Sequence, residues 1–166
     1  MLDINEANTA VLNRAPTSAT IATLTLAIEQ PKFQLLDSVA ILRGRESGKS
    51  AIVTGVSLMV EPTCCYWAYF LHGEGVDSSC SHAGHDLQPI EIGAVRKPIV
   101  KQPEFQLFDS VRLYTGEQGF ISGVEMAHPA DAEDWQYSVF GVGISQGEYF
   151  CADEIQQSQP SQHQAA

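Results

Sequence analysis

Apolar and polar residues alternate over several short stretches of this chain. In the clearest stretch, Trp135, Tyr137 and Val139 alternate with Gln136 and Ser138. In a β-strand, side chains two residues apart lie on the same face, so this pattern predicts a strand with one apolar face directed toward a core. The shortness of these stretches favours a protein built mainly of β-strands.

A ten-residue segment occurs twice with little change. Residues 30–39 read QPKFQLLDSV and residues 102–111 read QPEFQLFDSV, so that eight of the ten positions are identical at an offset of 72 residues. Self-similarity of this kind is typical of chains that contain repeated structural units. We therefore predict an internal duplication.

The similarity continues farther along the chain at an offset of 68 residues. There the pattern W-x-Y-x-x-x-G-x-G is present at residues 67–75 and again at residues 135–143. The change in offset means that the first copy has four additional residues. We place them in the Gly-, Ser- and charge-rich stretch 43–50, opposite the shorter stretch 115–119, because a turn between strands tolerates insertions.

Both copies predict the same order of elements. A strand near 37–43 or 109–115 is followed by a turn, a strand near 51–60 or 120–127, a polar loop, the aromatic strand, a Gly-rich turn and a short last strand. Such a series of short antiparallel strands predicts a small barrel. A sheet this small must close or pair to bury its edges and core, so we expect the copies to pack on each other.

The predicted fold class is therefore all-β, with the chain divided into four parts. These are an irregular lead-in (1–18), a first β-barrel repeat (19–91), a second β-barrel repeat (92–155) and a disordered tail (156–166). The tail is predicted to be disordered because it is polar, of low complexity and rich in Gln.

The order of these motifs resembles that of the small SH3-like barrels. It consists of Asp-x-Val, a turn, an apolar residue before Ser/Thr-Gly-Val, Trp-x-Tyr and a final acidic–apolar pair, over residues 33–87 and 105–155. The resemblance implies two tandem SH3-like barrels. The chain is also similar to small uncharacterised cyanobacterial proteins. SH3-like barrels include peptide-binding, nucleic-acid-binding and scaffolding members, so the resemblance implies no single function and no catalytic residue.

The charge of the chain is negative and unevenly distributed. The formal net charge is −11; residues 102–155 carry ten Asp or Glu against one Arg, whereas residues 92–101 carry three Lys or Arg and no acid. An acidic surface repels the phosphates of nucleic acids and anionic lipids and attracts basic partners. We therefore expect a protein partner, with a basic one favoured, and no nucleic acid.

Nothing at the start of the sequence indicates export or membrane insertion. The first residues carry no early Lys or Arg followed by an apolar stretch. No run approaches the length of about 18 apolar residues that a membrane span requires. We expect a cytoplasmic protein without a membrane partner, and its four cysteines are then expected to be free thiols.

The residues with the most reactive side chains in the first copy are Cys80, His82 and His85. A thiol and two imidazoles are ligands of zinc, nickel and copper, and a Cys–His pair can also support thiol catalysis. However, the cluster lacks the second ligand pair of a zinc finger, and the matching stretch 148–154 has no His. An incidental surface loop is the favoured interpretation, and we expect no cofactor.

Four aromatic residues could form a face on which a ligand stacks, namely Trp67, Tyr69, Trp135 and Tyr137. Packing in the core is the commoner role for aromatic residues that alternate along a strand, and it is the interpretation that we favour.

The acidic loop formed by Asp131, Glu133 and Asp134 is a candidate contact for a basic partner, although a solvated loop would have the same composition.

The sequence thus predicts a non-enzymatic protein-interaction or structural module. The alternative is a small metal-dependent or thiol enzyme centred on Cys80 and its two histidines. The alternative requires these three side chains to converge.

Overall fold

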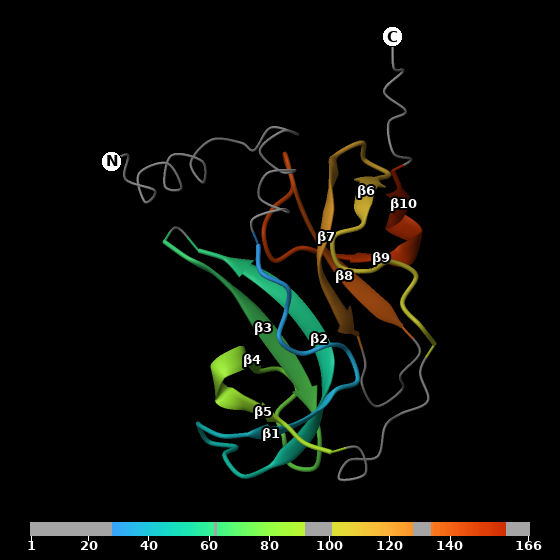
Figure 1. Cartoon of the computed structure of the whole chain (residues 1–166). Coiled ribbons are helices and arrows are strands. Elements are labelled where there is room, and N and C mark those ends of the chain that lie inside the picture. Colours follow the sequence, from blue (N-terminus) through green and yellow to red (C-terminus); the bar gives the residue numbers. More distant parts are fainter. Residues whose placement is uncertain (1–27, 62, 92–100, 128–133, 159–166) are drawn as a thin grey trace, which may run out of the picture.

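Residues 28–61, 63–91, 101–127 and 134–158 are described by the computed structural model (Figure 1). In this part of the chain ten strands form one antiparallel sheet, and the helical elements are two single turns of 3-10 helix. The predicted all-β class is confirmed. No helix within the described ranges is long and apolar enough to cross a membrane.

Residues 28–91, here called the first segment, form five strands and one 3-10 turn. The elements are β1 (Ser38–Ile41), β2 (Ser50–Val60), β3 (Cys65–His72), β4 (Ser81–Ala83), η1 (Gly84–Asp86) and β5 (Leu87–Pro89). Strand β1 pairs with β2 and β5, β2 also pairs with β3, and β3 also pairs with β4. Every pairing is antiparallel.

Residues 101–158, the second segment, contain the same elements in the same order. They are β6 (Ser110–Leu113), β7 (Gln118–Met126), β8 (Trp135–Gly141), β9 (Tyr149–Cys151), η2 (Ala152–Glu154) and β10 (Ile155–Gln157). Strand β6 pairs with β7 and β10, β7 with β8, and β8 with β9. Both segments therefore have one topology.

The long second strand of each segment contains an irregularity at the same place. The register shifts between Val53 and Gly55 in β2, and between Ile121 and Gly123 in β7. A bulge bends a strand and increases its twist. One long strand can therefore pair with the first strand at one end and with the third strand at the other while it curves around a core.

Each segment encloses its own apolar core, and alternation along the strands builds it. In β8, Trp135, Tyr137 and Val139 are buried, whereas Gln136 and Ser138 are only partly buried, as the alternation predicts. The core of the first segment contains the matching residues Tyr69 and Leu71, with Trp67 packed against it.

The two segments are joined by direct pairing of β2 with β7, which we call the seam (Figure 1). Val56 is opposite Val124 at its centre, with Gly55 opposite Glu125 on one side and Ser57 opposite Gly123 on the other. Each pair beside the centre thus contains one glycine.

Side chains from the loops before β1 and β6 also cross between the segments. Leu36 packs against the core of the second segment, and the Phe108 ring lies edge-on to Trp67 of the first, with ring centroids 5.8 Å apart. Leu35 and Leu107 contact both cores. The expectation that the two halves pack on each other is therefore confirmed.

Leu36 and Phe108 both adopt a backbone conformation that is rare for bulky residues, with φ of 68° and 71°. Their N–H groups donate to the carbonyl oxygens of Val53 and Ile121, each at 2.8 Å. These hydrogen bonds hold the backbone in the conformation that directs each side chain toward the opposite segment.

The end of the second segment lies beyond the predicted boundary at residue 155. Gln156 and Gln157 belong to β10, and the Ser158 N–H donates to the Ser110 carbonyl oxygen at 2.9 Å. The prediction of a tail from residue 156 is corrected for these residues, because strand pairing uses backbone groups that every non-proline residue has. The predicted lead-in 1–18, and the predicted tail from 159, lie outside the described residues.

Candidate functional site

The turn between β1 and β2 is the place where the first segment is longer than the second. Its closing hydrogen bond joins the Ile41 N–H to the Lys49 carbonyl oxygen, and the matching bond in the second segment joins Leu113 to Glu117, both at 2.9 Å. The additional four residues thus lie inside this turn, where the sequence analysis placed the insertion. Glu46 lies within this longer turn.

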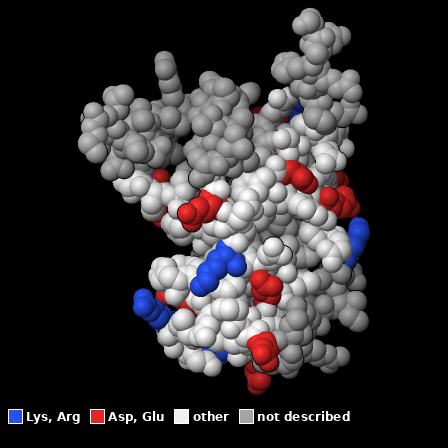
Figure 2. All heavy atoms as spheres, viewed as in Figure 1, with Lys and Arg blue, Asp and Glu red and all other residues white. Residues whose placement is uncertain are grey.

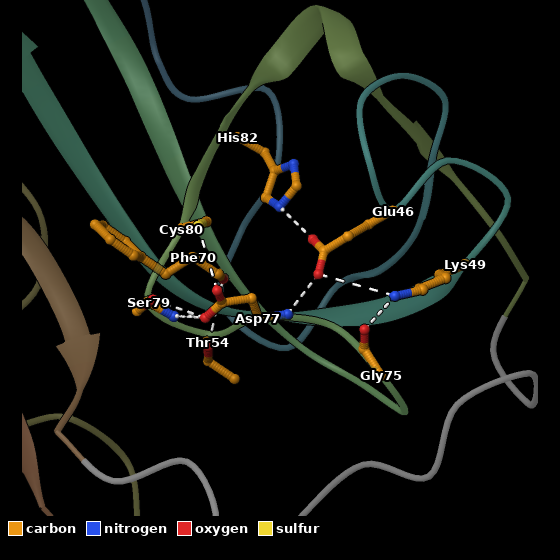
Figure 3. Close-up of polar contacts among 9 residues, drawn as sticks. All are labelled: Glu46, Lys49, Thr54, Phe70, Gly75, Asp77, Ser79, Cys80 and His82. Carbon is orange, nitrogen blue, oxygen red and sulfur yellow. Dashed lines mark hydrogen bonds and ion pairs between the residues drawn. The ribbon is translucent and has the colours of Figure 1, made fainter.

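Glu46 is a buried carboxylate, with 8% of the residue exposed. Its Oε1 accepts a hydrogen bond from the Asp77 N–H at 2.5 Å and lies 4.0 Å from Lys49 Nζ (Figure 3). Its Oε2 lies 3.4 Å from His82 Nε2. A buried charge is tolerated when it is paired and hydrogen-bonded, and these partners come from the turn itself, the β3–β4 loop and β4.

His82 is the imidazole that faces this carboxylate, from the middle of β4. Its side chain is 12% exposed. The geometry between Nε2 and Glu46 is not that of a hydrogen bond, and Nε2 has no hydrogen-bond partner in the described part of the chain. His82 on β4 thus faces the carboxylate of the inserted turn at close range.

Cys80 and Asp77 form a neighbouring exposed turn. The Asp77 Oδ1 accepts hydrogen bonds from the Ser79 N–H at 3.0 Å and the Ser79 hydroxyl at 2.7 Å, while the Cys80 thiol donates to Oδ2 at 3.6 Å. The bonds from Ser79 lower the pKa of Asp77, and the Cys80 bond and the charge of Arg45 add to the effect. The Cys80 N–H also donates to the Asp77 carbonyl oxygen at 3.2 Å, so the backbone and the side chain of Cys80 both contact Asp77 within this turn.

The three predicted metal ligands do not converge. His85 is exposed and its Nε2 lies 3.5 Å from Asp86 Oδ1, and the ligand atoms of Cys80, His82 and His85 are not within 4.8 Å of one another. A metal or catalytic site on these three residues requires their side chains to converge, and they do not.

Cys151, Asp153 and Glu154 do have ligand atoms within 4.8 Å of one another, as the only such group in the described ranges. All three residues are exposed. Glu154 Oε2 accepts a hydrogen bond from the Cys151 N–H at 2.8 Å, and this bond caps the 3-10 turn η2. The capping hydrogen bond accounts for the closeness of Cys151 and Glu154.

Tyr69 and Tyr137, proposed for a ligand-binding face, lie inside the two cores, with 1% and 0% of the residue exposed. Each hydroxyl accepts a hydrogen bond from a backbone N–H, from Lys32 at 2.8 Å and from Glu104 at 3.0 Å. Burial raises the pKa of both tyrosines. Packing, the favoured interpretation, accounts for their positions.

Trp67 and Trp135 occupy matching positions at the edge of these cores. Their Nε1 groups donate to the carbonyl oxygens of Glu29 and Lys101, each at 2.7 Å. Trp135 is 9% exposed, and Trp67 is partly covered by Phe108. The tryptophans anchor the chain that precedes each first strand.

The acidic loop is described only at its end. Asp131 and Glu133 lie outside the described residues, and Asp134 is exposed, with its carbonyl oxygen accepting a hydrogen bond from the Ala127 N–H at 3.0 Å. Glu46 is not among the candidate residues that the sequence predicts. The insertion itself was the available signal, since residues unique to one copy are candidates for a role unique to that copy.

Replacing Glu46 with alanine should destabilise the first segment by about 1–3 kcal/mol, because the Asp77 N–H would lose its acceptor in a partly buried position. Hydrogen exchange at Asp77 should accelerate in this variant. Glu74→Ala, at an exposed residue of the β3–β4 loop that also contains Asp77, is the control and should leave both quantities unchanged. Equal exchange in the two variants would show that Glu46 does not hold the loops.

Comparison of the chain with models of protein families and with curated protein sequences finds no match.

Proposed function

We propose that this chain is a non-enzymatic protein-interaction or structural module, formed by two SH3-like barrels that arose by internal duplication. The order of paired strands supports the barrels: β5-β1-β2-β3-β4 in the first segment and β10-β6-β7-β8-β9 in the second. In both segments a single 3-10 turn precedes the last strand.

Matching contacts support the duplication. The hydrogen bond to a buried tyrosine hydroxyl, the bond from the tryptophan indole, the left-handed residue before the first strand and the bulge in the second strand occur in both segments. They recur at the offsets of 72 and 68 residues found in the sequence. Specific details of this kind are more than two unrelated β-segments would share.

One observation carries the non-enzymatic part of the proposal: the chemically versatile groups of the first segment are used within the fold. Glu46 holds two loops together, Cys80 closes a turn, and His82 faces Glu46. An active site needs a nucleophile or base directed at a space that a substrate can enter. Here the same side chains stabilise loops instead.

The partner that best fits the charge of the protein is a basic protein. Within the described residues, the second segment carries eight Asp or Glu against Lys101 and Arg112. Figure 2 shows Asp and Glu side chains at several separate places on one face, with Lys and Arg side chains between some of them. Unpaired surface charge of one sign attracts partners of the opposite sign and speeds their association.

An octalysine peptide titrated into the full chain tests this proposal. The double variant Asp153→Asn, Glu154→Gln should weaken binding about fivefold, whereas the matched first-segment control Glu74→Gln, Glu91→Gln should change it less than about twofold. All four side chains belong to exposed residues. Absence of binding, or equal losses in both variants, would contradict a basic partner on the second segment.

A further inference from the structure

Glu125 lies on the seam between the segments, in a position that a glycine makes available. It is on β7, directly opposite Gly55 of β2. A Cβ atom added to Gly55 would lie 2.8 Å from Glu125 Cγ and 3.1 Å from its Cβ. The Glu125 side chain therefore lies over the bare backbone of the other segment.

One oxygen of this carboxyl group is shielded and unpaired. Glu125 Oε2 is buried from solvent and has no hydrogen-bond partner within the described residues. Burial raises the pKa of Glu125, and interactions with Tyr149 and Gln136 oppose the rise. An unpaired buried oxygen is costly, and the cost is greatest when the group is charged.

Tyr149 of β9 is a titratable neighbour of Glu125, although 44% of the residue is exposed. Burial, followed by the nearby charge of Glu125, raises the pKa of Tyr149 to about 12. Besides this tyrosine, three neutral residues lie around Glu125. Gln136 belongs to β8, Gly55 belongs to β2, and Phe70, which is paired with Gly55, belongs to β3. None of these groups carries a positive charge that would stabilise the carboxylate.

We propose that Glu125 is a proton-responsive latch on the seam, whose protonation strengthens the joining of the two segments and whose ionisation weakens it. The reason is geometric: the carboxyl group is held over Gly55 with one oxygen shielded, and a neutral group occupies such a place at a lower cost than a charged one. This inference rests on the fold and is independent of the proposed partner.

The direction of the pH dependence follows from linkage. A carboxyl group whose pKa is raised by folding contributes stability that is fully present below the ordinary pKa, 4.5 for Glu, and is lost as the pH rises through the higher pKa of the folded state. Ionisation of Glu125 therefore destabilises the seam at neutral pH but not at pH 4.

The experiment compares the full-length protein with Glu125→Gln, which keeps the shape of the side chain without the charge, and with Glu148→Gln, at an exposed residue of the same segment. Hydrogen exchange at Val56 and Val124 reports on the seam. At pH 7.5, exchange should be about threefold slower in Glu125→Gln than in the unsubstituted chain, while Glu148→Gln should match the unsubstituted chain. At pH 4 all three should agree.

A second variant distinguishes the proposed effect of Glu125 protonation from a general effect on stability. Tyr149→Phe removes the hydroxyl that opposes the pKa rise, so the titration of the Glu125 carboxyl carbon followed by NMR should move to higher pH. An equal effect of Glu125→Gln at both pH values, or an effect as large for Glu148→Gln, would overturn the proposal. An unchanged titration in Tyr149→Phe would also count against it.

Discussion

Replacing Tyr137 with alanine should lower the free energy of unfolding by about 3–5 kcal/mol, the range found for large aromatic residues removed from a core. Tyr137 is fully buried, packs edge-on against Phe105 with ring centroids 5.4 Å apart, and accepts a hydrogen bond from the Glu104 N–H. The substitution would leave both a cavity and an unpaired backbone donor. Urea denaturation followed by tryptophan fluorescence measures the loss.

One further variant measures the part of this stability loss that is due to the hydrogen bond, and another serves as a control. Tyr137→Phe keeps the ring but removes the acceptor for Glu104, so about 1 kcal/mol should be lost. Tyr114→Ala is the control, because Tyr114 is 66% exposed and its replacement should change stability by less than about 0.5 kcal/mol. If Tyr137→Ala cost no more than Tyr114→Ala, the ring would not belong to the core.

Gly141→Ala should destabilise the chain by about 3 kcal/mol, although only one methyl group is added. Gly141 is paired with Gly119 across β7 and β8. An added Cβ would collide with the carbonyl oxygen of Gln118 and lie 2.9 Å from the Gly119 Cα. Backbone atoms cannot rotate away as a side chain can, so the two strands would have to separate.

Gly147→Ala distinguishes this crowding from the cost of backbone conformation. Gly147 has a φ of 84° and open space around the position of a Cβ, so only the left-handed conformation opposes the substitution. Its expected cost is about 1 kcal/mol. Comparable losses in Gly147→Ala and Gly141→Ala, measured by the same denaturation, would show that the strands do not approach closely at residue 141.

The third strand of each segment was predictable because one local rule decides it. Alternation of Trp135, Tyr137 and Val139 with polar residues predicted which side chains would be buried, and the structure buries the same three. The location of the four additional residues was equally predictable. An insertion disturbs a strand pairing but not a turn, so the change of offset between matching strands of the two copies pointed to the β1–β2 turn.

The environment of the candidate site residues was not predictable in this way. His82 was noted as a possible metal ligand, yet its nearest charged neighbour is Glu46, 36 positions earlier in the chain. Nothing in the local sequence of Glu46 shows that it will be buried. Its burial depends on how the inserted turn folds against the β3–β4 loop, which is a long-range contact.

By itself, the sequence determined the β-strand character of this protein, the equivalence of positions 72 or 68 residues apart, and the turn that accepts the insertion. These properties depend on local alternation and on comparison of the chain with itself. Only the tertiary structure decided that β2 pairs with β7, that Leu36 and Phe108 reach across to the opposite segment, and that Glu125 lies over Gly55. Backbone pairing and shared burial join residues that are distant in sequence, and no local pattern specifies the partner.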